Sequence, residues 1–239
     1  MDKEIPEKPG RIMVISPHPD DIDFGCNGTV AKWTGQGREV VYVICTSGDK
    51  GTDNPNIKPE TLARIREEEQ RTAAKTVGVN RVDFLRMKDG ELENNMDLRR
   101  RLVKMIRVHQ PAYVVSMDPA NTLFENPYVS HKDHRETAIA VFDSIYPAAR
   151  NKNFFPELLE EGLMPHSVLG IFFFATPNPN TWIDITKTMD TKIAALQSHK
   201  SQIADFKDLE PWLRERHAEI GKSKGFSYGE AFRYLEFPM

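Results

Sequence analysis

Short apolar runs alternate with amphipathic stretches through the first half of the chain. Four of these runs are rich in β-branched or aromatic residues and span only a few positions each: 12–16, 40–46, 82–85 and 113–117. Their nearly continuous hydrophobicity is typical of strands that are buried on both faces of a parallel sheet. The pattern therefore predicts four buried strands.

Two long amphipathic segments lie between the predicted strands. Residues 59–77 carry apolar side chains at spacings of three and four, and Gly78 follows as a helix-ending residue. Residues 97–109 form the second segment, for which Asp97 is the expected N-cap and Pro111 the stop signal. Strands that alternate with helices in this way predict a βαβ sheet.

The last third of the chain follows a less regular pattern. It predicts two further strands and two helices, at 168–175, 182–185, 187–199 and 209–220. Neither an internal repeat nor a low-complexity linker interrupts the chain. We therefore expect a single α/β domain over residues 1–239, with a mostly parallel sheet flanked by helices and a C-terminal elaboration.

Composition narrows the classes of partner. With 239 residues, 39% of them hydrophobic, the chain can bury a sizeable core, and its formal charge of -3 provides no basic surface for nucleic acid. The N-terminal residues 1–8 are charged, and no apolar run reaches the ~20 residues that span a bilayer. Cys26 and Cys45 lack the CxxC spacing of a thiolate zinc site or a disulfide framework. We expect a cytoplasmic protein without nucleic-acid or membrane partners.

The residues that follow the first strand concentrate metal-ligand chemistry. His18, Asp20 and Asp21 lie in a loop with two prolines, at the edge of the sheet where α/β folds bind ligands. A catalytic zinc takes about three nitrogen or oxygen ligands and one water. His18 and Asp21 could bind such an ion and leave Asp20 free as a base. The alternative is that one of the aspartates only caps the next helix.

A second polar motif lies over a hundred residues downstream. Ser130 and Asp133 have the spacing of an N-cap and its acidic partner, so a helix would begin at His131 and place His131 and His134 on one face. The helix dipole favours a neutral His134, which suits a metal, but opposes a protonated His131 unless Asp133 or Asp118 lies near it. The sequence leaves this conflict open, and two solvated histidines remain the alternative.

Other polar segments carry weaker signals. Residues 46–51 have the composition of a phosphate loop but not its spacing, so we expect them to wall the same cleft. By composition, Arg66 and Glu69 belong to an exposed helix face. The remaining single histidines are interpreted as structural: His109, His166, His199 and His217.

Several motifs combine into a family resemblance. They are Pro17-His18-Pro19-Asp20-Asp21, Gly25-x-x-Gly28, Arg66-x-x-Glu69, Asp89-Gly90 and His131-Lys132-Asp133-His134, with Asp184-Ile185-Thr186, His199-x-Ser201-Gln202 and Tyr228 to Phe232 in support. With these motifs the chain resembles the LmbE-like, or PIG-L, family of zinc-dependent N-deacetylases over nearly its entire length. The resemblance implies a Rossmann-like sheet.

The resemblance also implies a role for each matching residue. It makes His18, Asp21 and His134 the zinc ligands, Asp20 the general base, His131 the group that faces the developing oxyanion, Asp133 a carboxylate that orients a histidine, and Arg66 a residue near the substrate. The same ligands would also accept Fe²⁺ or Co²⁺.

The resulting hypothesis is hydrolysis of an N-acetyl group on a small molecule that contains N-acetylglucosamine. Zinc would polarise the acetyl carbonyl and activate its bound water, and Asp20 would remove the proton from that water. Family resemblance also leads us to expect a homo-oligomer. The rival hypothesis is a non-catalytic Rossmann-like module that binds a sugar or nucleotide and holds a structural metal with four protein ligands.

Overall fold

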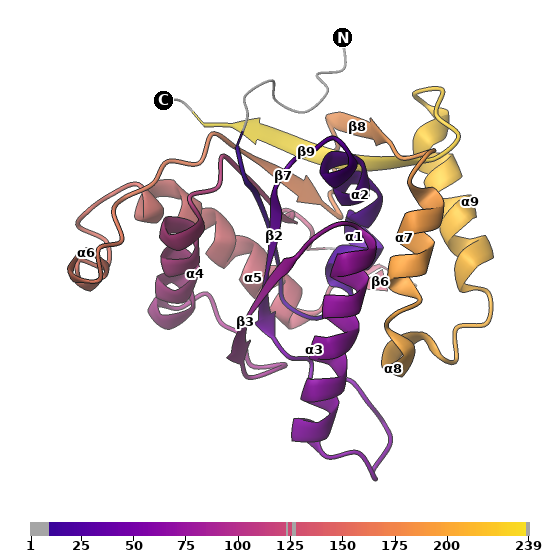
Figure 1. The fold of residues 1–239 in the computed structure, drawn as a ribbon, viewed down its shortest axis with the longest axis horizontal. Coiled ribbons are helices and arrows are strands. Elements are labelled where there is room, and N and C mark those ends of the chain that lie inside the picture. Colours follow the sequence, from indigo (N-terminus) through magenta and orange to yellow (C-terminus); the bar gives the residue numbers. More distant parts are fainter. Residues whose placement is uncertain (1–9, 123, 126–127, 238–239) are drawn as a thin grey trace.

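The computed structural model describes residues 10–122, 124–125 and 128–237 (Figure 1). Within them a seven-stranded sheet has the order β3-β2-β1-β4-β7-β9-β8. Its strands are β1 (Ile12–Ser16), β2 (Val40–Thr46), β3 (Arg81–Met87), β4 (Tyr113–Met117), β7 (Gly170–Phe174), β8 (Thr181–Asp184) and β9 (Gly229–Glu236). The first five strands in this order run parallel, whereas β9 is antiparallel to both β7 and β8. The predicted α/β class with a mostly parallel sheet is confirmed.

Helices cover both faces of the sheet. The helical segments are α1 (Asp21–Gly25), α2 (Asn27–Gly35), α3 (Pro59–Thr76), α4 (Met96–His109), α5 (Lys132–Asp143), the π-helical η1 (Ser144–Ala149), α6 (Glu157–Glu160), α7 (Met189–Leu196), α8 (Lys200–Ile203) and α9 (Leu209–Lys222). A second, two-stranded sheet pairs β5 (Phe124–Glu125) with β6 (Tyr128–Val129) in antiparallel fashion. In Figure 1, α3, α7 and α9 lie on one side of the sheet and α4 and α5 on the other.

Alternation along the strands divides the core into two layers. Val14 of β1 packs in one apolar cluster with residues of α2, α3, α7 and α9, while its neighbour Ile15 packs in another with residues of α4 and α5. Successive side chains of a strand point to opposite faces, so a strand covered on both sides must be apolar at every position. This requirement explains the uninterrupted apolar runs in the sequence.

Two expectations about the sheet and its helices were wrong, and one strand was missed. β3 is an edge strand and is only partly buried, because helix α3 covers it without a second neighbour strand. Helix α4 is capped by Asn95, whose side chain accepts hydrogen bonds from the backbone N–H groups of Asp97 and Leu98, so Asp97 is not the N-cap. The last strand, β9, was not predicted, since its charged residues break the apolar run.

The order of strands reverses beside β1. From β1 the chain moves outward to β2 and β3 and then returns to β4 on the other side of β1. In open α/β sheets the carboxyl ends of strands at such a reversal are where ligands bind. The loop that follows β1 and the segment that follows β4 contain the two predicted polar motifs. Among the described residues, every helix is too short or too polar to cross a membrane.

Candidate active site

Asp20 occupies the turn between β1 and helix α1. Its backbone has a φ of 90°, in the left-handed region that residues other than glycine rarely adopt, and its side chain makes no capping hydrogen bond to α1. Its carboxylate instead accepts a hydrogen bond from the Arg66 guanidinium at 3.1 Å. The interpretation of Asp20 as a simple helix cap is therefore wrong.

His18, Asp21 and His134 meet beside this turn. One Asp21 carboxylate oxygen lies 3.3 Å from His18 Nδ1, and the other lies 3.1 Å from His134 Nε2. Ligands of a tetrahedral site with metal bonds of about 2.0 Å are about 3.3 Å apart. The Asp21–His18 and Asp21–His134 pairs, drawn from two segments more than a hundred residues apart, each have the separation of two neighbouring ligands of a divalent ion.

The second nitrogen of His18 is held by two carboxylates. His18 Nε2 lies 3.1 Å from both Asp133 and Asp89, and Asp133 also accepts hydrogen bonds from the N–H groups of Gly90 and Leu92. Burial would lower the pKa of His18, but its hydrogen bonds to Asp133, Asp21 and Asp89 raise it to about 12. The site thus strongly favours a positive charge at its centre, which a proton or a metal ion can supply.

Two overlapping groups of described residues could hold a metal. Ligand atoms of His18, His131 and His134 lie within 4.8 Å of one another, as do those of His18, Asp89 and Asp133. The second group contacts His18 through Nε2, the position at which a carboxylate usually orients a metal-binding histidine. We therefore favour the face of His18 that carries Nδ1, where Asp21 and His134 lie.

His131 is the N-cap of helix α5. Its Nδ1 accepts a hydrogen bond from the N–H of Asp133 at 3.1 Å, so the predicted cap at Ser130 was wrong and the helix begins at Lys132. Because Nδ1 is the acceptor, the neutral ring carries its proton on Nε2 and can donate it without being charged. Burial and the neighbouring His18 and His134 lower the pKa of His131. A neutral His131 does not conflict with the helix dipole. The carboxylate of Asp118 instead accepts hydrogen bonds from the N–H of Ala120 and the hydroxyl of Thr176.

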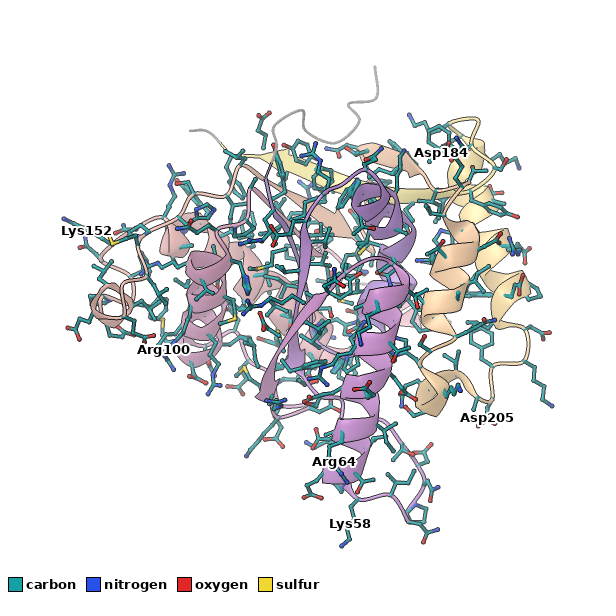
Figure 2. All side chains as sticks on the ribbon, in the orientation of Figure 1. Lys58, Arg64, Arg100, Lys152, Asp184 and Asp205 are labelled. Atoms are coloured by element: carbon teal, nitrogen blue, oxygen red, sulfur yellow. The ribbon has the colours of Figure 1, made fainter. Side chains whose placement is uncertain are left out.

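Arg66 is buried, although Arg64 on the same helix is exposed (Figure 2). Its guanidinium donates to the carbonyl oxygens of Pro19 and Gly48 as well as to Asp20. Burial raises the pKa of Asp20 to about 6, and the charge of Arg66 opposes that rise. Assigning Arg66 to an exposed helix face was wrong, because the loop after β1 folds over it.

Sequence reasoning assigned no role to Asp89 and did not consider Gln70. Asp89 follows β3 and contacts His18, and its position before Gly90 at the end of a strand was an available signal. Gln70, on helix α3, accepts a hydrogen bond from the backbone N–H of Asp20 at 2.9 Å. Gln70 differs from most of its polar neighbours on α3 only in lying on the buried face of the helix.

A family model and a related protein of known activity both match this chain. Residues 13–145, more than half of the chain, match the PIG-L family model, which is described as GlcNAc-PI de-N-acetylase. Diacetylchitobiose deacetylase of Thermococcus kodakarensis is 34% identical, with 94% of this chain and 83% of that protein covered. The chain belongs to the PIG-L family. The suspected resemblance and the deacetylase character of its family are confirmed.

Two further comparisons match the chain over most of its length. The structure of N,N'-diacetylchitobiose deacetylase from Pyrococcus horikoshii superimposes with a TM-score of 0.87 at 35% identity, with 95% of this chain and 84% of that one covered. A probable N-acetyl-alpha-D-glucosaminyl L-malate deacetylase of Bacillus anthracis is 27% identical, with 81% of each chain covered. By their names, these relatives are deacetylases of two different N-acetylated compounds.

Proposed function

We propose that this PIG-L protein is a metal-dependent hydrolase that removes the N-acetyl group from a small molecule containing N-acetylglucosamine. One observation carries the proposal: Asp20, a partly buried carboxylate whose side chain takes no part in helix capping, lies beside the donor cluster of His18, Asp21 and His134. A structural site has no need of a carboxylate that neither binds the ion nor caps a helix, whereas hydrolysis of an amide requires a base.

The donor set fits a divalent ion. His18 Nδ1, the Asp21 carboxylate and His134 Nε2 would hold it, with Asp89 and Asp133 orienting His18 from behind. Bound there, zinc, or Fe²⁺ or Co²⁺, would supply a Lewis acid for the acetyl carbonyl and lower the pKa of a water from about 15.7 towards about 7.

The protein's own residues would move the protons. Asp20, with its pKa raised to about 6 by burial, takes a proton from the attacking water as the new bond to the acetyl carbon forms. His131 donates its Nε2 hydrogen to the developing oxyanion, since its Nδ1 is committed to the helix cap. Asp20 then returns its proton to the amine nitrogen as the C–N bond breaks, and the products are acetate and a free amine.

The favoured substrate is N,N'-diacetylchitobiose. Support comes from the two diacetylchitobiose deacetylases, which match this chain at 34% and 35% identity over nearly its whole length. We place Arg66 near the substrate, beside Asp20. From the family we also expect the protein to form a homo-oligomer. The free, buried thiols of Cys26 and Cys45 fit the reducing cytoplasm expected from the sequence.

The test is release of acetate and of a primary amine by the zinc-loaded protein from N-acetylglucosamine, N,N'-diacetylchitobiose and an N-acetylglucosaminyl malate. We expect the disaccharide to react fastest. Asp20→Asn should lower kcat by about 10²- to 10⁴-fold, because the variant cannot accept the proton of the attacking water.

Metal content is measured on the same samples. Asp20→Asn should retain one equivalent of metal, whereas Asp21→Asn should lose most of it. Stoichiometric metal binding by the wild-type protein without release from any of the substrates would favour the rival binding module with a structural ion.

A further inference from the structure

We infer that Gln70, Asp23 and His199 are positioning residues for Asp20, linked in a buried chain of hydrogen bonds that extends from the C-terminal third of the protein to the backbone of the proposed base. This inference rests on the proposed function in assigning a catalytic role to Asp20. Its structural part, the restraint of the Asp20 backbone, stands independently of any substrate.

Asp20 needs an external restraint. Its φ of 90° is unfavourable for a residue with a Cβ, and such conformations persist only where the surroundings hold them. The side chain of Asp20 is steered by Arg66, but its backbone N–H has one partner on another element, the side-chain oxygen Oε1 of Gln70 at 2.9 Å. Loss of that bond would free the turn that aims the carboxylate.

The orientation of the Gln70 amide is determined by Asp23. Gln70 is fully buried, and its Nε2 donates to Asp23 Oδ2 at 2.8 Å. An ionised carboxylate only accepts hydrogen bonds, so the NH₂ end of the amide must face Asp23 and the oxygen must face Asp20. Asp23 therefore fixes the amide orientation in which Gln70 Oε1 accepts from the Asp20 N–H.

Asp23 is in turn held by donors on two other segments. His199, at the start of α8, donates from Nε2 to Asp23 Oδ2 at 3.0 Å, and Asn27 donates to Oδ1. The Asn27 oxygen itself accepts from the hydroxyl of Tyr42. Both Asp23 and His199 are fully buried, so no water replaces a lost donor without rearrangement.

His199 lies outside residues 13–145, the part of the chain that matches the PIG-L model. Taken as a single histidine it has the features of a structural residue, and only its connection through Asp23 and Gln70 relates it to Asp20. A displacement of about 1 Å in a reacting group can cost about 10²-fold in rate. A residue of the C-terminal third would thus affect kcat at a site whose proposed metal ligands all lie within the first 134 residues.

Three variants test the chain of contacts. Gln70→Met removes both amide contacts at similar volume, and His199→Leu removes the donor to Asp23. His199→Gln places an amide nitrogen near the position of Nε2 and should rescue the contact. The control is His109→Leu, which breaks a part-buried histidine–aspartate pair of 2.7 Å with Asp83. The carbonyl of His109 accepts a hydrogen bond from Arg11, which directly precedes β1, so the residue lies towards the amino-terminal ends of the strands, away from the site.

We expect Gln70→Met and His199→Leu to lower kcat about 10- to 100-fold, with KM within about twofold of wild type and with full metal content. His199→Gln should stay within about threefold of wild-type kcat. His109→Leu should lower the melting temperature without changing kcat. Equal kcat in His199→Leu and His109→Leu would overturn the inference, because both variants would then report only a lost histidine–aspartate pair.

A second readout needs no substrate. Amide hydrogen exchange of Asp20, followed by NMR on labelled protein, should be at least ten times faster in Gln70→Met and His199→Leu than in wild type, His199→Gln or His109→Leu. Unchanged exchange at Asp20 would refute the restraint. If the wild-type protein released no acetate while the exchange pattern held, the proposed function would fail and the positioning network would stand.

Discussion

At the scale of single residues, His131 caps a helix with one ring nitrogen and, in the proposed mechanism, donates from the other. Nδ1 caps helix α5, and Nε2 is left to donate into the site. Replacement by asparagine, itself a strong N-cap, keeps the first task and removes the second. We expect His131→Asn to keep wild-type stability in urea denaturation but to lower kcat by about 10²- to 10³-fold, the loss typical of one oxyanion donor.

His131→Ala is the matched variant. It should show the same loss of kcat and, in addition, a loss of about 1 kcal/mol in the free energy of unfolding, because the helix is left without its cap. Turnover that survived in His131→Asn would contradict a donating role for Nε2 and leave His131 as a cap only.

The sequence predicted the residues of the site better than their partners. The sequence singles out His18 and Asp21 because imidazole and carboxylate groups after a strand end are a chemical signal. It singles out His134 because two histidines share the first turn of a helix, and the structure brings the three residues together. Asp89 carries the same signal at the end of β3 but was given no role, and Gln70 carries little, since a single glutamine is common on any helix. Their importance depends on distances between segments, which no single-chain pattern contains.

At the scale of elements, a buried ion pair joins helices α1 and α2. Lys192 of α7 donates to the carbonyl oxygens of Asp23 and Phe24 at the end of α1, while Glu230 of β9 accepts from the N–H groups of Gly28 and Thr29 at the start of α2. The two side chains also pair with each other at 2.9 Å. Each charge therefore lies at the helix end whose dipole it complements.

Removal of one charge from this pair should be costly. Lys192→Met leaves Glu230 buried without its cation, and we expect the free energy of unfolding to fall by about 3 to 5 kcal/mol in urea titrations. Lys192→Met combined with Glu230→Gln removes both charges and should lose less than the sum of the single variants. A loss below about 1 kcal/mol in Lys192→Met would show that the pair does not hold the two helices.

Element boundaries were predictable where one physical rule dominates. The runs 12–16, 40–46 and 113–117 coincide with β1, β2 and β4, because a strand covered on both faces must be apolar throughout. The apolar pattern does not predict β9, because this antiparallel strand is only partly buried and contains Arg233 and Glu236. Its role in the sheet follows from pairing with β7, which is a long-range property.

At the scale of the whole molecule, buried histidines link stability to pH. His217 of α9 lies among Lys192, Glu230 and Arg216, and its Nδ1 donates to the carbonyl oxygen of Gly229 at 2.9 Å. Burial, together with the charge of Lys192, lowers its pKa from 6.5 to about 4. The native protein therefore keeps this ring neutral at a pH where the unfolded chain protonates it.

The sign of the effect follows from this difference. Between pH 6.5 and about 4 the unfolded state binds more protons than the native state, so stability falls as the pH falls through that window and is constant outside it. A shift of this size corresponds to about 3 kcal/mol.

His217→Asn keeps the donor to Gly229 but cannot titrate. The free energy of unfolding, measured by urea from pH 7 to pH 4, should decline about 3 kcal/mol more in wild type than in His217→Asn. Parallel curves for the two proteins would mean that His217 does not carry this linkage, and the acid sensitivity of the fold would then lie with other groups.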